Sequence, residues 1–494
     1  MKFTSTLFLL LVTLSCFAQK VEIPVDTTVV TNHSVTINGE NINYSATTGF
    51  QPVWNETGEP IASLYYTYYQ RSGIKNQENR PLVVSFNGGP GSASVWMHIA
   101  YTGPRILKID DEGFPVQPYG IKENPHSILD VADIVYVNPV NTGYSRPIPD
   151  EGGNVERDMF FGVNADISYL AEWLNTFVTR NNRWLSPKYL IGESYGTTRV
   201  SGLALELQNS QWMYLNGVIL VSPTELGIER EGPVEVANRL PYFAATAWYH
   251  KVLPPELQNK DLDELLEEVE AYTITEVLPV LVKGGFAEEA EREEIAERMA
   301  YYSGVSKKVF LQNNLEVPIR SFWKELLRDK SGYTVGRLDS RYLGLDAKDA
   351  GDSPDYNAEL TSWLHSFTPA INYYLREELN FKTDLKYFMF GPVHPWDRTG
   401  NNSGENLRQA MAQNPNLDVL IQSGYFDGAT TYFNAKYSMW QLDQSGKMKD
   451  RLSFKGYRSG HMMYLRNEDL RNANDDIREF IQKTLPKEGE SAKY

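Results

Sequence analysis

Three residue types that together perform acyl-transfer chemistry occur in this sequence in a fixed order. Ser194 lies within Gly192-Glu193-Ser194-Tyr195-Gly196, a G-x-S-x-G pattern, and Asp427 and His461 follow it. A serine hydroxyl becomes a strong nucleophile when a histidine removes its proton and an acid fixes the tautomer of that histidine. We therefore predict a triad of Ser194, Asp427 and His461 that forms a covalent acyl-enzyme.

His461 is selected because it alone follows a predicted core strand, residues 452–457, on a glycine-led loop. Asp427 is selected in the same way, since it follows the apolar run 417–421, whereas Asp418 lies inside that run and is expected to be structural. The remaining histidines precede Ser194 or fall in a segment that we assign to an insertion; they are His33, His98, His126, His250, His365 and His394.

The elements around Ser194 explain how it would be positioned. A short apolar run of strand type, residues 188–191, precedes it, and residues 197–207 have helical spacing. A side chain at either flanking glycine would collide with the neighbouring strand or helix. This strand–turn–helix arrangement is the nucleophile elbow of α/β-hydrolases, which also carry their triad in the order serine, acid, histidine.

The fold class follows from strands that alternate with helical segments. This alternation predicts a mainly parallel sheet with flanking helices, that is, an α/β-hydrolase fold. The buried-type strands are expected at residues 82–86, 133–137, 188–191, 215–221, 417–421 and 452–457.

A large insertion is predicted between the two parts of this core. Residues 225–395 contain amphipathic helical patterns and no parallel-strand signal, so we expect a mostly helical cap over the site. The core would then comprise residues 19–224 and 396–485, with a flexible tail at 486–494. The alternative is a separate domain of unrelated function.

A glycine-rich loop could complete the site. Asn87-Gly88-Gly89-Pro90-Gly91 follows the strand 82–86, where an α/β-hydrolase supplies one backbone N–H to the oxyanion hole. The residue after the nucleophile, Tyr195, supplies the other. A phosphate-binding loop is the alternative, but the lysine and the Ser/Thr of a P-loop are missing.

Composition limits the partners and the compartment. The 494 residues carry a net charge of −16, which argues against nucleic acid and against an anionic membrane surface. Lys2, an apolar run at 7–12 and an ending at Ala18 predict a secretory signal peptide, residues 1–18. We therefore expect a secreted or periplasmic protein without a membrane span; a lipid anchor at Cys16, the only cysteine, is the alternative. No metal site, cofactor or oligomeric state is indicated.

Five blocks together resemble the serine carboxypeptidase family. They are the Asn-Gly-Gly-Pro-Gly loop at 87–91, residues 138–145, the Gly-Glu-Ser-Tyr-Gly elbow at 192–196, Gly-Tyr-Phe-Asp at 424–427 and Gly-His-Met at 460–462. The resemblance implies hydrolysis of the C-terminal peptide bond of peptides with a free C-terminus. An esterase or acyltransferase with the same triad, and an inactive hydrolase fold used for binding, remain as alternatives.

The resemblance also implies roles for further residues. Asn87 and Glu193 match residues that bind the terminal carboxylate of the substrate, and Gly89 and Tyr195 match the oxyanion donors.

One departure concerns the acidic partner of Glu193, because Tyr101 replaces a glutamate that is usual in the family. Either Tyr101 supplies a neutral donor, which predicts a less acidic pH optimum, or it packs in the core and another group, such as Arg105, binds the carboxylate.

Overall fold

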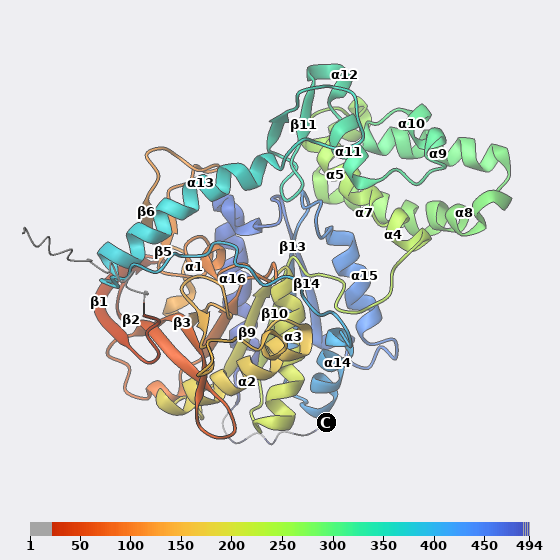
Figure 1. Cartoon of the computed structure of the whole chain (residues 1–494). Helices are drawn as coiled ribbons and strands as arrows, with labels where there is room; N and C mark the ends of the chain where they lie inside the picture. The colour runs from red at the N-terminus through yellow and green to blue at the C-terminus, as the bar shows by residue number, and fades with distance from the viewer. Residues whose placement is uncertain (1–21, 488, 490, 492, 494) are drawn as a thin grey trace, which may run out of the picture.

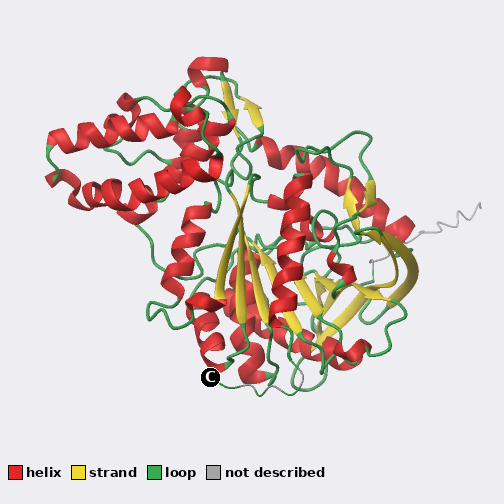
Figure 2. Cartoon of the chain, turned by 180° about the vertical axis from the view of Figure 1, so that it is seen from behind, coloured by secondary structure: helices red, strands yellow, loops and turns green. Residues whose placement is uncertain are grey.

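The computed structural model describes residues 22–487, 489, 491 and 493. The predicted signal peptide, with Ala18 and Cys16, lies outside the described residues. Figures 1 and 2 show a twisted central sheet covered by helices on both faces. Its ten strands are β1 (Thr28–Ile37), β2 (Glu40–Trp54), β3 (Pro60–Arg71), β4 (Leu82–Phe86), β7 (Asp133–Val137), β8 (Arg146–Pro147), β9 (Lys188–Glu193), β10 (Gly217–Val221), β13 (Asp418–Gly424) and β14 (Leu452–Tyr457).

The sheet has an antiparallel edge and a parallel body. Its order is β1-β2-β3-β7-β4-β9-β10-β13-β14, with β8 paired to β3. The six strands from β7 to β14 are all parallel. Central parallel strands are buried on both faces, which explains why β4 and β7 read as nearly continuous apolar runs. The predicted mainly parallel sheet with flanking helices is confirmed.

Two hydrophobic clusters lie on opposite sides of this sheet. One contains side chains of α2, α3 and α14, and the other contains side chains of α1, α13 and α16. In α16 the buried residues Leu470, Ala473 and Ile477 recur at helical spacing, so that one face packs on the sheet. The helices of the core are α1 (Val95–His98), α2 (Val163–Arg180), α3 (Tyr195–Ser210), α14 (Ser403–Gln413), α15 (Tyr432–Leu442) and α16 (Asn467–Thr484).

A helical lobe stands above the carboxyl ends of the parallel strands (Figure 1). It has a hydrophobic cluster of its own, formed by residues between Ala237 and Val335. α13 (Ala358–Tyr373) instead packs on the main core and runs from the lobe across the molecule. The lobe contains α4 (Pro233–Ala237), α5 (Leu240–Tyr249), α6 (Pro255–Gln258), α7 (Leu262–Tyr272), α8 (Leu278–Lys283), α9 (Glu289–Ser303), α10 (Lys307–Gln312), α11 (Ile319–Glu325), α12 (Arg328–Ser331) and the hairpin β11 (Tyr333–Val335)–β12 (Leu343–Leu345). A second small hairpin, β5 (Arg105–Leu107)–β6 (Ile121–Glu123), lies outside the lobe.

In the part of the chain that the structure describes, no helix combines the length and the apolar character needed to cross a bilayer.

Candidate active site

The turn between β9 and α3 holds Ser194 in a strained conformation. Its φ and ψ angles are +57° and −127°, a backbone conformation that residues other than glycine rarely adopt. A Cβ at Gly192 would lie 2.2 Å from the carbonyl oxygen of Gly196, and one at Gly196 would lie 2.8 Å from that of Phe86. Both flanking positions therefore require glycine, and the turn projects Ser194 into a cavity.

Asp427 and His461 form a hydrogen-bonded pair beside this serine. Nδ1 of His461 lies 2.6 Å from Oδ2 of Asp427. The other carboxyl oxygen accepts bonds from the backbone N–H groups of Ala429 (2.8 Å) and Thr430 (3.1 Å), which fix the carboxylate. Burial lowers the pKa of His461, but the charge of Asp427 and its hydrogen bond outweigh burial, and the pKa is raised above its ordinary value.

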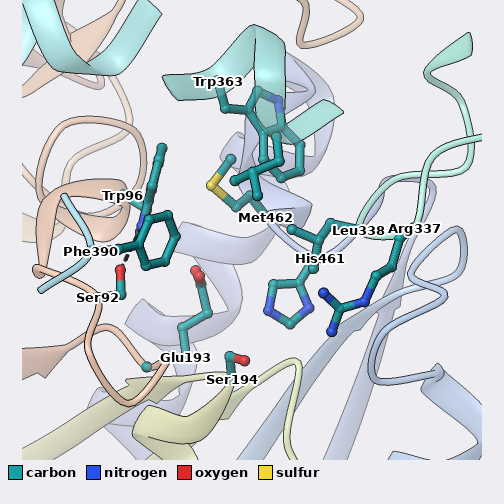
Figure 3. Close-up of a pocket in the computed structure, with 13 residues that line it drawn as sticks. Ser92, Trp96, Glu193, Ser194, Arg337, Leu338, Trp363, Phe390, His461 and Met462 are labelled. Carbon is teal, nitrogen blue, oxygen red and sulfur yellow. Dashed lines mark hydrogen bonds between the residues drawn. The ribbon is translucent and has the colours of Figure 1, made fainter. Parts of the chain in front are cut away.

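Ser194 and His461 line one cavity, and Asp427 lies behind the histidine. Figure 3 shows the imidazole of His461 next to Ser194, with Glu193 on one side and Arg337 on the other. Segments more than 200 residues apart in the sequence therefore meet at the carboxyl ends of β9, β13 and β14. This arrangement can activate a serine for attack on a carbonyl carbon.

Backbone donors lie close to the nucleophile, since Gly89 lines the same cavity and Tyr195 follows Ser194 directly. Within residues 22–487, no hydrogen bond engages the backbone N–H of Gly89 or of Tyr195. The two segments touch, since a Cβ at Gly88 would lie 2.5 Å from the nitrogen of Tyr195. Gly89 has a φ of +104°, a conformation that favours glycine. The loop and the start of α3 thus present free N–H groups where an oxyanion would need them.

Glu193 is a buried carboxyl group that lines the same cavity. Burial raises its pKa to about 7, against the opposing effects of His461 and of its hydrogen-bond partners. The hydroxyl group of Tyr464 donates a hydrogen bond to Oε2 of Glu193. Glu193 is therefore protonated over the acid range and up to about neutral pH, so it can donate a hydrogen bond to an anion.

Asn87 is also buried at this position. Its Oδ1 accepts a hydrogen bond from the backbone N–H of Met97 (3.1 Å), which orients the amide group. The amide lies close enough to lower the pKa of Glu193 and of Tyr464. No well-formed hydrogen bond engages its Nδ2 among the described residues. A buried donor without an acceptor is available for a ligand.

Of the two alternatives for Tyr101, the structure supports packing in the core, and it places Arg105 outside the cavity. Tyr101 is fully buried, and its hydroxyl group donates to Oε1 of Gln422 (2.6 Å) rather than to Glu193. Its ring stacks on that of Tyr464 with 4.5 Å between centroids. Arg105 forms an ion pair with Glu378 (2.9 Å) and does not line the cavity. Tyr464 is thus the neutral partner of Glu193, and no sequence pattern indicated it.

Other residues of the cavity were also missed. An apolar part is formed by Trp96, Trp363, Phe390 and Met462, and Arg337 and Leu338 enter from the segment between β11 and β12. Of these, Met462 alone gave a signal, because it follows His461 directly. No sequence pattern placed the other residues near Ser194, since each reaches the site only through tertiary packing.

Metal ligands do not gather anywhere in residues 22–487: no group of three or more His, Cys, Asp or Glu side chains there could hold an ion.

Comparisons with known proteins agree with this geometry. The family model described as "Serine carboxypeptidase" matches residues 38–274. Serine carboxypeptidase-like 16 of Arabidopsis thaliana is 27% identical over 191 residues, which is 35% of this chain and 40% of that protein. Vitellogenic carboxypeptidase of Aedes aegypti is 28% identical over 151 residues, 30% of this chain and 29% of that protein.

A solved structure extends the comparison to nearly the whole fold. The prohormone-processing carboxypeptidase Kex1 of Saccharomyces cerevisiae superposes with a TM-score of 0.52 at 12% identity, covering 89% of this chain and 91% of that one. The predicted α/β-hydrolase fold is thereby confirmed. In sequence, the chain matches 40% or less of the length of the two curated relatives named above. Residues 38–274 are thus similar to the serine carboxypeptidase family, and the fold of the chain is shared with a member of that family.

Proposed function

We propose that this protein is a serine-type carboxypeptidase that removes C-terminal residues from peptides through an acyl-enzyme on Ser194. The observation that carries this proposal is Glu193, a buried and protonated carboxyl group directly before the nucleophile. A general esterase has no need for an anion-binding donor at this position. An exopeptidase needs one, because its substrate carries a carboxylate one residue beyond the bond that is cut.

The proposed reaction has two halves, acylation of Ser194 and hydrolysis of the acyl-enzyme. Protonated Glu193 and the amide of Asn87 donate hydrogen bonds to the terminal carboxylate. Oγ of Ser194 attacks the scissile carbonyl carbon while Nε2 of His461 takes its proton, and Asp427 stabilises the imidazolium.

The oxyanion that results accepts hydrogen bonds from the N–H groups of Gly89 and Tyr195. His461 then protonates the leaving amine, and the C–N bond breaks. In the second half, His461 takes a proton from water, and the water oxygen attacks the ester of Ser194. Collapse of this second intermediate returns the proton to Oγ and releases the shortened peptide.

An N-blocked dipeptide and its C-terminally amidated form test this proposal. We expect the free acid to be cleaved in preference to the amide, and Ser194→Ala to abolish both reactions. Cleavage of esters without cleavage of either peptide would indicate an esterase or acyltransferase instead. Absence of turnover together with absence of labelling of Ser194 by an organofluorophosphate would contradict the enzyme function altogether.

We also propose that residues 225–395 act as a cap that shapes the substrate cavity. In support, Leu338, Leu360 and Trp363 of this segment line the cavity. The carbonyl oxygen of Leu338 accepts a hydrogen bond from the backbone N–H of His461 (2.6 Å). A cap tied to the catalytic loop would set side-chain preference.

Export of the chain is part of the same proposal, because the signal at residues 1–18 precedes the core. Mass spectrometry of the mature protein tests it. An N-terminus directly after Ala18 supports a secreted or periplasmic protein, whereas a lipid-modified Cys16 at the N-terminus would show anchoring.

A further inference from the structure

A second cavity adjoins Ser194 on the side of Tyr195 and α3. It shares Gly89, Ser194, Arg337 and Leu338 with the cavity described above, but Glu193 does not line it. Three arginine side chains line this second cavity, which we call the arginine pocket: Arg230, Arg337 and Arg398. Three cations at one site are unexpected in a chain whose net charge is −16.

Neighbouring carboxylates balance only part of the positive charge of this pocket. In the described part of the chain, Arg337 and Arg398 form no ion pair, and Glu225 is the only acidic residue that lines the pocket. Arg230 pairs with Glu235 (3.0 Å), but its buried Nη1 has no hydrogen-bond partner among the described residues. Guanidinium groups in this state favour a carboxylate ligand.

Arg337 is carried by a segment that the catalytic loops hold in place. Its carbonyl oxygen accepts a hydrogen bond from the backbone N–H of Gly428 (2.9 Å), next to Asp427. The following residue, Leu338, donates its N–H to Oε1 of Glu359 (2.9 Å). None of these bonds involves the guanidinium group, so a substitution of the side chain leaves them intact.

Arg398 is held in a similar way by the backbone. Asp397, the residue before it, bonds through its N–H to the carbonyl oxygen of Phe161 (3.0 Å) and through its own carbonyl oxygen to the N–H of Val163 (2.8 Å). The charge of Arg398 reaches the ring of Tyr195, because it opposes the rise in the pKa of that side chain. The two arginines thus approach the nucleophile from different segments.

The position of Glu193 decides which part of a substrate would enter the arginine pocket. Glu193 lies on one side of Ser194 and Arg337 on the other (Figure 3). If Glu193 holds the terminal carboxylate, the leaving residue occupies the apolar cavity with Trp96 and Phe390. The residue that contributes the scissile carbonyl group must then extend its side chain toward the opposite side, where the arginines lie.

We propose that the arginine pocket selects peptides with an aspartate or glutamate directly before the C-terminal residue. This specificity rests on the carboxypeptidase function proposed above. The protein would therefore trim acidic peptides that end in a large apolar residue, with Arg337 and Arg398 as specificity-determining residues.

The test uses three N-blocked dipeptides that end in phenylalanine and carry glutamate, glutamine or lysine before it. Two exposed ion pairs of about 0.7 kcal/mol each, one to Arg337 and one to Arg398, sum to about 1.4 kcal/mol, which corresponds to tenfold. We therefore expect kcat/KM to be about tenfold higher for glutamate than for glutamine at low salt. In 1 M NaCl the ratio should fall severalfold because salt screens exposed charges. Lysine should be the poorest of the three.

The variants Arg337→Gln and Arg398→Gln should each lower the glutamate-to-glutamine ratio about threefold, and the double variant should bring it close to one. The ratio is the decisive quantity because Arg337 also lowers the pKa of His461, an effect that both substrates share. Arg320→Gln is the matched control, because Arg320 is an exposed residue of α11 and does not line the pocket. This substitution should leave the glutamate-to-glutamine ratio unchanged.

Equal cleavage of the glutamate and glutamine peptides by the wild type would overturn this inference while leaving the carboxypeptidase function intact. So would a loss of the preference for the free acid over the amide in Arg337→Gln, because Arg337 would then hold the terminal carboxylate. Cleavage of none of the peptides would instead contradict the proposed function itself.

Discussion

Replacement of Glu193 by glutamine isolates the protonation state of the proposed carboxylate-binding group. Burial raises the pKa of Glu193 from 4.5 to about 7, so the carboxyl group donates a hydrogen bond below that pH and carries a charge above it. Glutamine keeps a similar shape and donates from its NH₂ group at every pH. The variant therefore removes the titration and keeps a donor.

The size of the effect follows from the change in pKa. The rise in the pKa of Glu193 from 4.5 to about 7 corresponds to about 3 kcal/mol between the protonated and the ionised state. Because the folded-state pKa lies above the unfolded value, the folded chain binds the extra proton, and stability declines as pH rises from 4.5 to 7. Above pH 7 an ionised Glu193 would also repel the substrate carboxylate, so kcat/KM should fall about tenfold per pH unit.

The assay is the pH profile of kcat/KM for an N-blocked dipeptide, measured for the wild type and for Glu193→Gln. We expect the alkaline limb of the wild type to begin near pH 7, mainly through a rise in KM, and to be absent in the variant. Both proteins should show an acid limb, because His461 must lose its proton to act as a base. This limb should lie at slightly lower pH in the variant, since the charge of Glu193 contributes to the raised pKa of His461.

Glu359 offers a matched control. Burial raises its pKa to about 7 as well, but it lies outside the cavity lining and accepts a hydrogen bond from Leu338. Glu359→Gln should alter the pH dependence of urea unfolding and leave the alkaline limb of kcat/KM in place. If the alkaline limbs of the kcat/KM profiles of the wild type and Glu193→Gln coincide, Glu193 does not bind the substrate carboxylate in its protonated form.

Three further variants test the surrounding structure. Asp427→Asn should lower kcat about 10⁴-fold at neutral pH by favouring the wrong tautomer of His461; a loss below tenfold in a kinetic assay would exclude the triad. Gly192→Ala should destabilise the fold by about 3 kcal/mol, since its Cβ would meet a backbone oxygen at 2.2 Å; an unchanged urea midpoint would contradict the steric argument. Arg341→Met should cost about 3–5 kcal/mol by leaving buried Asp339 without its partner at 2.6 Å; thermal unfolding at the wild-type temperature would refute this.

Local sequence patterns predicted the core well because they act over short distances. The runs at 82–86 and 133–137 form strands with those same bounds, since an apolar strand buried on both faces has a continuous apolar signature. The run at 452–457 also forms a strand with the predicted bounds, at the edge of the sheet. The glycines around Ser194 also gave a reliable signal, because a tight turn imposes its steric requirement on the residues nearest in sequence.

The partners of Glu193 could not be predicted from local sequence patterns. The resemblance directed attention to Tyr101, yet its hydroxyl group points to Gln422, and Tyr464 reaches Glu193 from 271 residues away in the chain. Which of two stacked tyrosines faces the carboxyl group depends on how α16 and β13 pack beside them. No pattern within either segment encodes that choice.

The sequence by itself therefore determined the type of fold, the order of the proposed triad and the serine on its turn, because strand periodicity and glycine sterics are local properties. The tertiary structure decided the environment of the serine: the neutral partner of Glu193, the apolar cavity and the arginine pocket. Burial, electrostatic balance and pKa depend on which distant segments meet. Arg337 and Arg398 line a pocket with Ser194 only because segments that are far apart in the sequence meet there.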